Sequence, residues 1–170
     1  MVTAQVSCGI KKSNKRLQLF NESTDLIAVR KLIHKTVEIN YPGFYDDQIV
    51  RFFKDYHSFE RVREQAQKGY SLVYVQHDKI VGTGTLVGNH ISSVYVDPAF
   101  QYKGLGKRIM FALLNEAERR RIFKLALDAT PGSVTFYQRL GFNVIREEVQ
   151  WIDSVSSLFY YRMERELYGY

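Results

Sequence analysis

The sequence predicts an α/β (α+β) domain with a central, mixed, mostly antiparallel sheet of about seven strands and helices on both faces. Short runs rich in β-branched and aromatic residues, bounded by turn formers, recur along the 170 residues. Stretches with helical spacing of apolar residues separate some of these runs, while others follow one another directly. Neighbouring antiparallel strands combined with strand–helix–strand connections imply such a covered sheet. Without a linker or internal repeat, we expect residues 1–170 to form one domain.

The part of the chain before residue 70 is predicted to be mostly helical. Residues 1–15 alternate weakly and then become basic, which indicates a frayed lead-in or an extra edge strand. Cap-forming residues and glycine or proline breaks delimit the segments that follow. The expected elements are a strand at 16–20 and helices at 26–37, 49–53 and 57–68.

The part after residue 70 is predicted to supply most of the sheet. Gly82 and Gly84 lie within one of its strands and indicate a bulge or the close approach of another element. The expected elements are strands at 71–76, 80–87 and 90–97, a helix from 107 onward, a strand at 124–129, a helix at 134–140, and strands at 143–152 and 158–164.

Composition narrows the function classes. The net charge of +6 comes partly from short basic runs, and no nucleic-acid-binding motif accompanies them, so we expect no nucleic-acid partner. The single cysteine, Cys8, excludes an internal disulfide, and the four histidines show no metal-ligand spacing. With no signal-like or bilayer-length apolar segment, we expect a cytoplasmic protein that binds no metal and no membrane.

The chain is organised around residues 94–110, where a β-branched strand ends at Asp97-Pro98 and a helix follows a short loop. The first N–H groups of a helix lack internal partners and carry partial positive charge. Gly104 and Gly106 lack a Cβ and let an anion approach the backbone, while Lys103 and Lys107 add positive charge. This stretch predicts a phosphate or pyrophosphate cradle.

Two known phosphate cradles do not fit these residues. A dinucleotide fingerprint needs glycine where Ile109 stands, and a P-loop needs glycine at Gln101 and Ser or Thr at Arg108. What fits is Gln-x-x-Gly-x-Gly, formed by Gln101, Gly104 and Gly106 directly after a strand end. This motif resembles that of the GNAT acyltransferase superfamily, and the resemblance covers roughly residues 16–166.

The resemblance implies the twisted GNAT sheet and acetyl-CoA as co-substrate, with its pyrophosphate held by the glycine-bearing loop. Where many relatives carry Asn and Ala, this chain has Thr130 and Ser133, both small and polar enough to contact pantetheine. The implied coenzyme contacts are Val94, Tyr95, Val96, Gln101, Tyr102, Lys103, Gly104, Leu105, Gly106, Lys107, Thr130, Ser133 and Phe136.

A second motif supports the same family. Residues 135–142 contain Phe-Tyr-x-x-x-Gly-Phe, which looks like the family's short helix beside the coenzyme sulfur. The resemblance makes Tyr137 the acid that protonates the departing thiolate, a role suited to a hydroxyl placed where negative charge develops. The alternative is an amphipathic helix with a half-buried tyrosine and Gly141 as an ordinary C-cap.

The sequence leaves two interpretations of His90 as a candidate general base. Many relatives place a glutamate on the strand before the cradle, and His90 stands at that register, eleven residues before Gln101. Strict alternation would put His90, Ser92, Val94 and Val96 on one face. A histidine titrates near neutrality and would serve directly or through water; alternatively, His90 only ends a strand. His34 and His57 are expected to be structural or exposed.

The acceptor pocket is expected between the first helices, where Tyr41 and Tyr45 either form its wall or pin a helix turn to the core. The resemblance implies an N-acetyltransferase acting on a primary amine of a small molecule or peptide by direct attack in a ternary complex, as a monomer or homodimer. The alternative is a non-catalytic acyl-CoA-binding or sensing module of the same fold.

Overall fold

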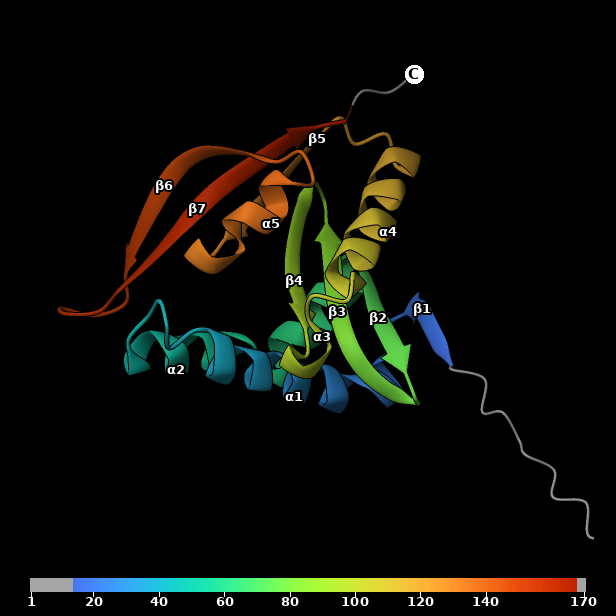
Figure 1. Ribbon diagram of the computed structural model, residues 1–170, viewed down its shortest axis with the longest axis horizontal. Helices are drawn as coiled ribbons and strands as arrows, with labels where there is room; N and C mark the ends of the chain where they lie inside the picture. The colour runs from blue at the N-terminus through green and yellow to red at the C-terminus, as the bar shows by residue number, and fades with distance from the viewer. Residues whose placement is uncertain (1–13, 168–170) are drawn as a thin grey trace, which may run out of the picture.

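The computed structural model describes residues 14–167, which form a seven-stranded sheet in the order β1-β2-β3-β4-β5-β7-β6 (Figure 1). Within these residues β4 and β5 are parallel and all other neighbours are antiparallel, so the predicted mixed sheet is confirmed. The strands are β1 (Lys15–Leu19), β2 (Tyr70–Gln76), β3 (Lys79–Val87), β4 (His90–Val96), β5 (Lys124–Ala129), β6 (Asn143–Trp151) and β7 (Ser157–Glu166).

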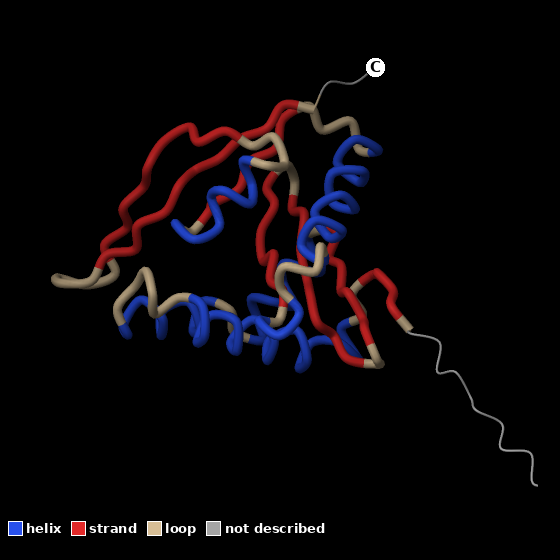
Figure 2. The backbone as a smooth tube through the Cα atoms, viewed as in Figure 1, coloured by secondary structure: helices blue, strands red, loops and turns tan. Residues whose placement is uncertain are grey.

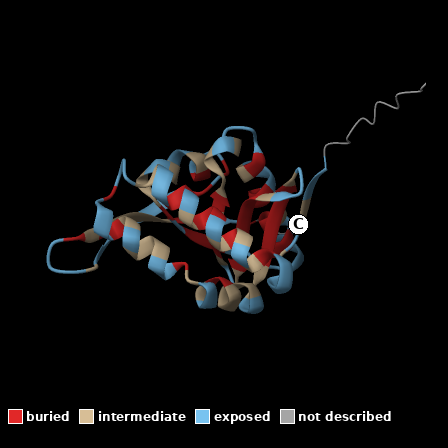
Figure 3. Cartoon of the chain, turned by 90° about the horizontal axis from the view of Figure 1, so that it is seen from below, coloured by how far each residue is buried: buried red, intermediate tan, exposed pale blue. Residues whose placement is uncertain are grey.

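Helices cover both faces of the sheet, as predicted (Figure 2). One core lies between the sheet and α4 and α5, and a second lies between the sheet and α1 and α3. A smaller third cluster joins α2 to β7. The buried residues follow the strands and the inner faces of the helices (Figure 3). The helices are α1 (Glu22–Asn40), α2 (Asp47–Tyr56), α3 (Phe59–Lys68), α4 (Leu105–Arg119) and α5 (Val134–Gln138), with short 3₁₀ turns at Pro98–Phe100 and Pro131–Ser133.

Side-chain caps set the starts of the first three helices. Asn21 and Asp46 accept hydrogen bonds from the N–H groups of Ser23 and Ile49, as their position before the helical runs predicts. The prediction that a helix begins at His57 is wrong. Ser58 caps α3, because its hydroxyl oxygen accepts the N–H of Arg61, and His57 instead ends α2.

Gly82 and Gly84 allow α4 to pack directly against β3, which confirms the predicted close approach. A Cβ on Gly82 would lie 2.8 Å from a methyl of Ile109, and one on Gly84 would lie 2.6 Å from another. Ile109 is fully buried. The pairing of β3 with β4 is also irregular at this point.

A β-bulge in β4 overturns the predicted alternation of its side chains. Thr83 of β3 pairs with Tyr95, yet Thr85 pairs with Ser92, so β4 carries one extra residue at Ser93, whose φ is +53°. The bulge reverses the faces of the residues beyond it. Ile91 before the bulge and Val94 and Val96 after it pack in the α4 core, while Tyr95 packs in the α1 core. His90 therefore does not share a face with Val94.

The parallel contact between β4 and β5 is short. It consists of two residue pairs, His90 with Ala126 and Ile91 with Leu127, after which the strands part. β5 then pairs along its whole length with β7, and the β6–β7 hairpin leans away from β4 (Figure 1). Among residues 14–167, no strand pairs with the carboxyl half of β4 on this side, which leaves it a free edge.

The described residues contain no helix long and apolar enough to cross a membrane. β1 confirms the strand predicted at 16–20 and forms one edge of the sheet, whereas the frayed lead-in or extra edge strand predicted over residues 1–15 falls almost entirely outside the described residues.

We predict that Gly84→Ala lowers the free energy of unfolding by about 1–3 kcal/mol, because the added methyl would overpack Ile109 and Leu113. Urea denaturation followed by circular dichroism measures this loss. Gly43→Ala is the matched control, since a Cβ there meets no described atom within 4 Å. Equal stability of the two variants would contradict the close packing of α4 on β3.

Candidate active site

A cleft of about 840 Å³ opens where β4 and β5 part. This volume lies within the range of small-molecule and cofactor pockets. Its walls come from the end of β4, the loop and first turn of α4, the end of β5, α5, and the loop between α1 and α2. The predicted site residues that line it are Tyr41, Val94, Tyr95, Val96, Gln101, Tyr102, Gly104, Leu105, Gly106, Lys107, Thr130, Ser133, Phe136 and Tyr137.

The N-terminus of α4 faces the cleft without a cap. Gly104 occupies the N-cap position with φ +80°, and among residues 14–167 no side chain bonds to this helix end. The first helical hydrogen bond runs from the N–H of Arg108 to the carbonyl of Gly104. The N–H groups of Leu105, Gly106 and Lys107 therefore lack helical acceptors, and the first turn carries no acidic residue. This end is a ready anion site.

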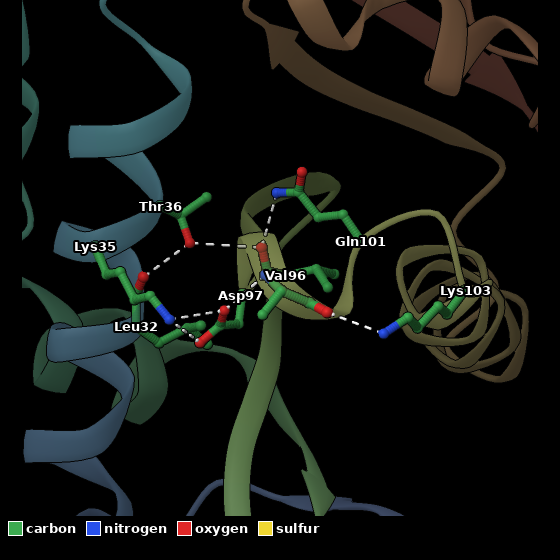
Figure 4. A network of polar contacts seen from close by, with 8 residues as sticks. Leu32, Lys35, Thr36, Val96, Asp97, Gln101 and Lys103 are labelled. Carbon is green, nitrogen blue, oxygen red and sulfur yellow. Dashed lines mark hydrogen bonds and ion pairs between the residues drawn. The ribbon is translucent and has the colours of Figure 1, made fainter.

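The loop before α4 is tied to the end of β4 (Figure 4). The side-chain amide of Gln101 donates to the carbonyl of Val96 at 2.9 Å, and the hydroxyl of Thr36 approaches the same oxygen at 3.5 Å. Lys35 of α1 pairs with Asp97 at 2.8 Å. Burial alone would raise the pKa of Asp97, but the hydrogen bonds from Lys35 and from the N–H of Ala99 outweigh it and hold that pKa below its usual value. Gln101 thus fixes the loop.

The basic side chains near the cleft differ in their hydrogen bonding and in whether they line it. Lys103 donates to the carbonyl of Ala99 at 3.0 Å and is not among the described lining residues (Figure 4). Lys107 lies in the lining and is exposed. So is Arg139, which directly follows α5 and which sequence reasoning missed because it falls at an unspecified position of the Phe-Tyr-x-x-x-Gly-Phe motif. The side chain of Tyr102 points fully into solvent.

Tyr137 is buried in the cleft wall, with its ring against those of Phe136 and Phe142 at 5.0 and 6.2 Å. Phe142 is fully buried and Gly141 ends the turn with φ +83°, so the glycine and second phenylalanine of the motif fix the position of α5. Burial raises the pKa of Tyr137, and the nearby Tyr41 adds to the effect. Its hydroxyl therefore stays protonated at neutral pH.

Thr130 and Ser133 sit where β5 runs into α5. Their hydroxyl oxygens are 3.1 Å apart, and the Ser133 hydroxyl donates to the carbonyl of Thr130 at 2.9 Å. Because the Ser133 hydroxyl has donated its hydrogen, the Thr130 hydroxyl donates to it. Both residues line the cleft, so the lone pairs of the Thr130 hydroxyl are available to a bound molecule.

His90 lies behind the cleft wall rather than in it. Of the described residues on this side, Ser92 and Asp128 line the cleft and His90 does not. The Nε2 atom of His90 is 3.6 Å from an oxygen of Asp128, which also pairs with Arg162 at 2.7 Å. Burial lowers the pKa of His90, the Asp128 charge opposes this, and Arg162 adds to the lowering. Asp128 was missed because its place in the cleft depends on β4 and β5 parting.

The loop between α1 and α2 supplies the far wall. Tyr41 and Phe44 line the cleft, and the Phe44 ring packs so closely over Gly132 that a Cβ there would lie 2.7 Å from it. Tyr45 is not part of the described lining. Its hydroxyl donates to the carbonyl of Phe159 at 2.7 Å, which ties the loop to β7. In residues 14–167 no cluster of potential metal ligands occurs.

Known structures share this fold. A GCN5-related N-acetyltransferase from Rhodopseudomonas palustris has a TM-score of 0.82 at 18% identity, covering 89% of this chain and 95% of that one. PaiA N-acetyltransferase from Thermoplasma acidophilum, in complex with coenzyme A, has a TM-score of 0.71 at 15% identity, covering 90% and 99%. The sheet, helices and split strands are those of the N-acetyltransferase fold.

Sequence comparison identifies the family. The model of the acetyltransferase (GNAT) domain matches residues 42–164, so the chain belongs to the GNAT acetyltransferase family. Glucosamine 6-phosphate N-acetyltransferase of Trypanosoma brucei brucei is 33% identical over 72 residues, covering 42% of this chain and 48% of that protein. GCN5-related N-acetyltransferase 1, chloroplastic, of Arabidopsis thaliana is 32% identical over 103 residues, covering 56% and 49%. The chain matches about half the length of these relatives.

We predict that Gly106→Val weakens coenzyme A binding by at least about tenfold, since lost charge-assisted hydrogen bonds contribute about 1.5–3 kcal/mol each. The added side chain would press on Phe136, whose ring lies 3.2 Å from the Cβ position. Isothermal calorimetry measures the affinity, with a thermal melt to confirm folding.

Lys103→Ala is the comparison variant. Its ammonium group is bonded to Ala99, and an exposed charge contributes about 1 kcal/mol or less, so we expect a loss below about fivefold. Unchanged affinity in a folded Gly106→Val protein would contradict the anion site at α4.

Proposed function

We propose that the protein transfers the acetyl group of acetyl-CoA to a primary amine of a small molecule or peptide, by direct attack in a ternary complex. The observation that carries this proposal is the cleft itself, which brings an uncapped α4 N-terminus and the hydroxyl of Tyr137 together beside the free edge of β4. The family and the names of its relatives agree with this activity.

The residues of the cleft fit coenzyme A. The N–H groups of Leu105, Gly106 and Lys107 suit a pyrophosphate, and Gly104 leaves the approach open because a Cβ there meets no described atom within 4 Å. The free edge of β4 offers backbone donors and acceptors to an extended amide chain such as pantetheine. When bound, acetyl-CoA supplies the acyl group in the activated form of a thioester.

Tyr137 is the proposed general acid. Its raised pKa keeps a proton on the hydroxyl oxygen, and that proton stabilises negative charge that develops on a sulfur leaving group. His90 is the proposed base, and it would act through Asp128 or a water at the cleft wall because it does not line the cleft itself.

The proposed acceptor is a primary amine. The carboxylate of Asp128 in the cleft wall would attract an ammonium group, although Arg162 shares it. The relative named glucosamine 6-phosphate N-acetyltransferase supports a small-molecule amine. Cytoplasmic location and a homodimer stay predictions.

A thiol-release assay with acetyl-CoA across a panel of sugar, polyamine and peptide amines tests the proposal. Release that depends on an amine and yields the N-acetyl product supports the transferase. Tight coenzyme A binding without turnover on any amine would instead favour the acyl-CoA-binding module.

We predict that Tyr137→Phe lowers the single-turnover rate by about 10²–10⁴-fold, the usual contribution of a general acid. The substitution keeps the ring contacts with Phe136 and Phe142 and removes only the hydroxyl. Coenzyme A affinity and melting temperature should change little. Rapid-quench measurement of acetyl transfer decides, and a parental single-turnover rate would make Tyr137 a packing residue.

We predict an acidic limb in the kcat/KM profile that belongs to His90. The base must be neutral, and burial lowers its pKa, so the limb lies below pH 6.5. His90→Ala should remove the limb and lower kcat/KM by about 10²-fold. Because the Asp128 charge raises the pKa of His90, Asp128→Asn should move the limb to lower pH. A His90→Ala protein with the parental rate and profile would place the base elsewhere.

A further inference from the structure

Three side chains form a polar chain from the cleft into the core. Tyr41, in the cleft lining, has its hydroxyl oxygen 3.3 Å from that of Tyr95. The Tyr95 oxygen is in turn 3.5 Å from Nε2 of His57. Tyr95 and His57 are 8% and 4% exposed, so water does not compete for these contacts. The chain exists because the bulge at Ser93 turns Tyr95 toward α1 and α2.

The far end of the chain has a fixed hydrogen-bond direction. The Nδ1 atom of His57 lies 2.8 Å from the carbonyl oxygen of Phe53. A carbonyl oxygen only accepts hydrogen bonds, so Nδ1 must carry the hydrogen. In neutral His57 the Nε2 atom is then an acceptor, and the hydroxyl of Tyr95 must donate to it.

His57 is neutral at physiological pH. Burial, with smaller contributions from the nearby His34 and Arg61, lowers its pKa to about 4 against the opposing effect of the hydrogen bond to Phe53. Because the Tyr95 hydroxyl donates its hydrogen to His57, the Tyr41 hydroxyl must donate to the Tyr95 oxygen. The Tyr41 oxygen has then used its hydrogen and has only lone pairs left for other partners.

We propose that His57 and Tyr95 are positioning residues that hold the Tyr41 hydroxyl as a hydrogen-bond acceptor for an N–H of the acceptor amine. The proposal rests on the proposed transferase function. A primary amine that donates one N–H to a fixed oxygen has fewer orientations open to its nucleophilic lone pair. The chain discriminates in favour of N–H donors, because a group with only lone pairs would meet the lone pairs of Tyr41.

The hydrogen-bond chain of Tyr41, Tyr95 and His57 orients the amine and does not store its proton. With a pKa of about 4, His57 is a poor proton acceptor at neutral pH. This separates its role from that of His90, which lies on the β5 side of the sheet against Asp128.

The direction of the chain is measured by NMR of the imidazole nitrogens of His57 in the ¹⁵N-labelled, full-length protein at pH 7. We expect the neutral tautomer with hydrogen on Nδ1, and a change in the Nε2 shift in Tyr95→Phe. A neutral tautomer with hydrogen on Nε2 would overturn the proposal. This measurement needs no turnover.

The function of the hydrogen-bond chain is measured by the kinetics of acetyl transfer to an amine. Tyr95→Phe keeps the ring and removes one hydroxyl, and we expect kcat/KM for the amine to fall about fivefold to tenfold. His57→Leu should give a similar loss, and the double variant should lose no more than either single one, since both break the same chain. Tyr56→Phe is the matched control. Its hydroxyl lies outside the chain and accepts from Arg61, and its ring is 5.2 Å from that of His57.

The outcomes separate this proposal from the proposed function. If the parent is active and its Tyr95→Phe variant keeps kcat/KM within about twofold, the positioning role of the hydrogen-bond chain is overturned and the proposed transferase function stands. Fully additive losses in the double variant overturn it as well. A parent that acetylates no amine overturns the proposed function, and the NMR result then decides alone whether the chain has the stated direction. The NMR result also decides if a variant fails to fold.

Discussion

The structure depends on the short parallel contact between β4 and β5. Among the described strands this is the place where the sheet stops pairing before its strands end, after two residue pairs. Unpaired backbone groups must find partners, so the free edge of β4 favours a ligand with amide groups of its own. The same opening exposes the first turn of α4 and admits Tyr137 from α5. A fully paired β4 and β5 would have closed the cleft that all these groups share.

The uncapped α4 end is stabilised from its surroundings rather than by a cap of its own. The loop before it is held by the hydrogen bond from Gln101 to the carbonyl of Val96 and by the Lys35–Asp97 pair (Figure 4). The body of the helix is pressed against Gly82 and Gly84 of β3. Three helical N–H groups can therefore stay free for an anion, because the backbone that carries them cannot rearrange to satisfy them internally.

Most of the fold could be predicted from local sequence, and part of the site could not. Strand and helix positions follow from periodicity and caps such as Asn21 and Asp46, which act within a few residues. The cradle was visible because Gln101, Gly104 and Gly106 lie close together in the sequence. The bulge at Ser93 depends on its pairing with β3, so period-2 alternation assigned the wrong faces along β4. Asp128 and His57 acquire their surroundings through contacts with distant elements, which no local pattern encodes.

The division of the interior into separate cores has a consequence for how the protein diversifies. α4 and α5, which form one wall of the cleft, pack in one core, while α1, Tyr41 and the start of α2 belong to the other two. Changes at sites that share no partners have nearly independent effects on stability. Apart from Phe44, whose ring packs on Gly132, substitutions in the loop between α1 and α2 should therefore leave the core under α4 and α5 intact. The two walls of the cleft can therefore vary with little effect on each other's packing, during evolution or in the laboratory.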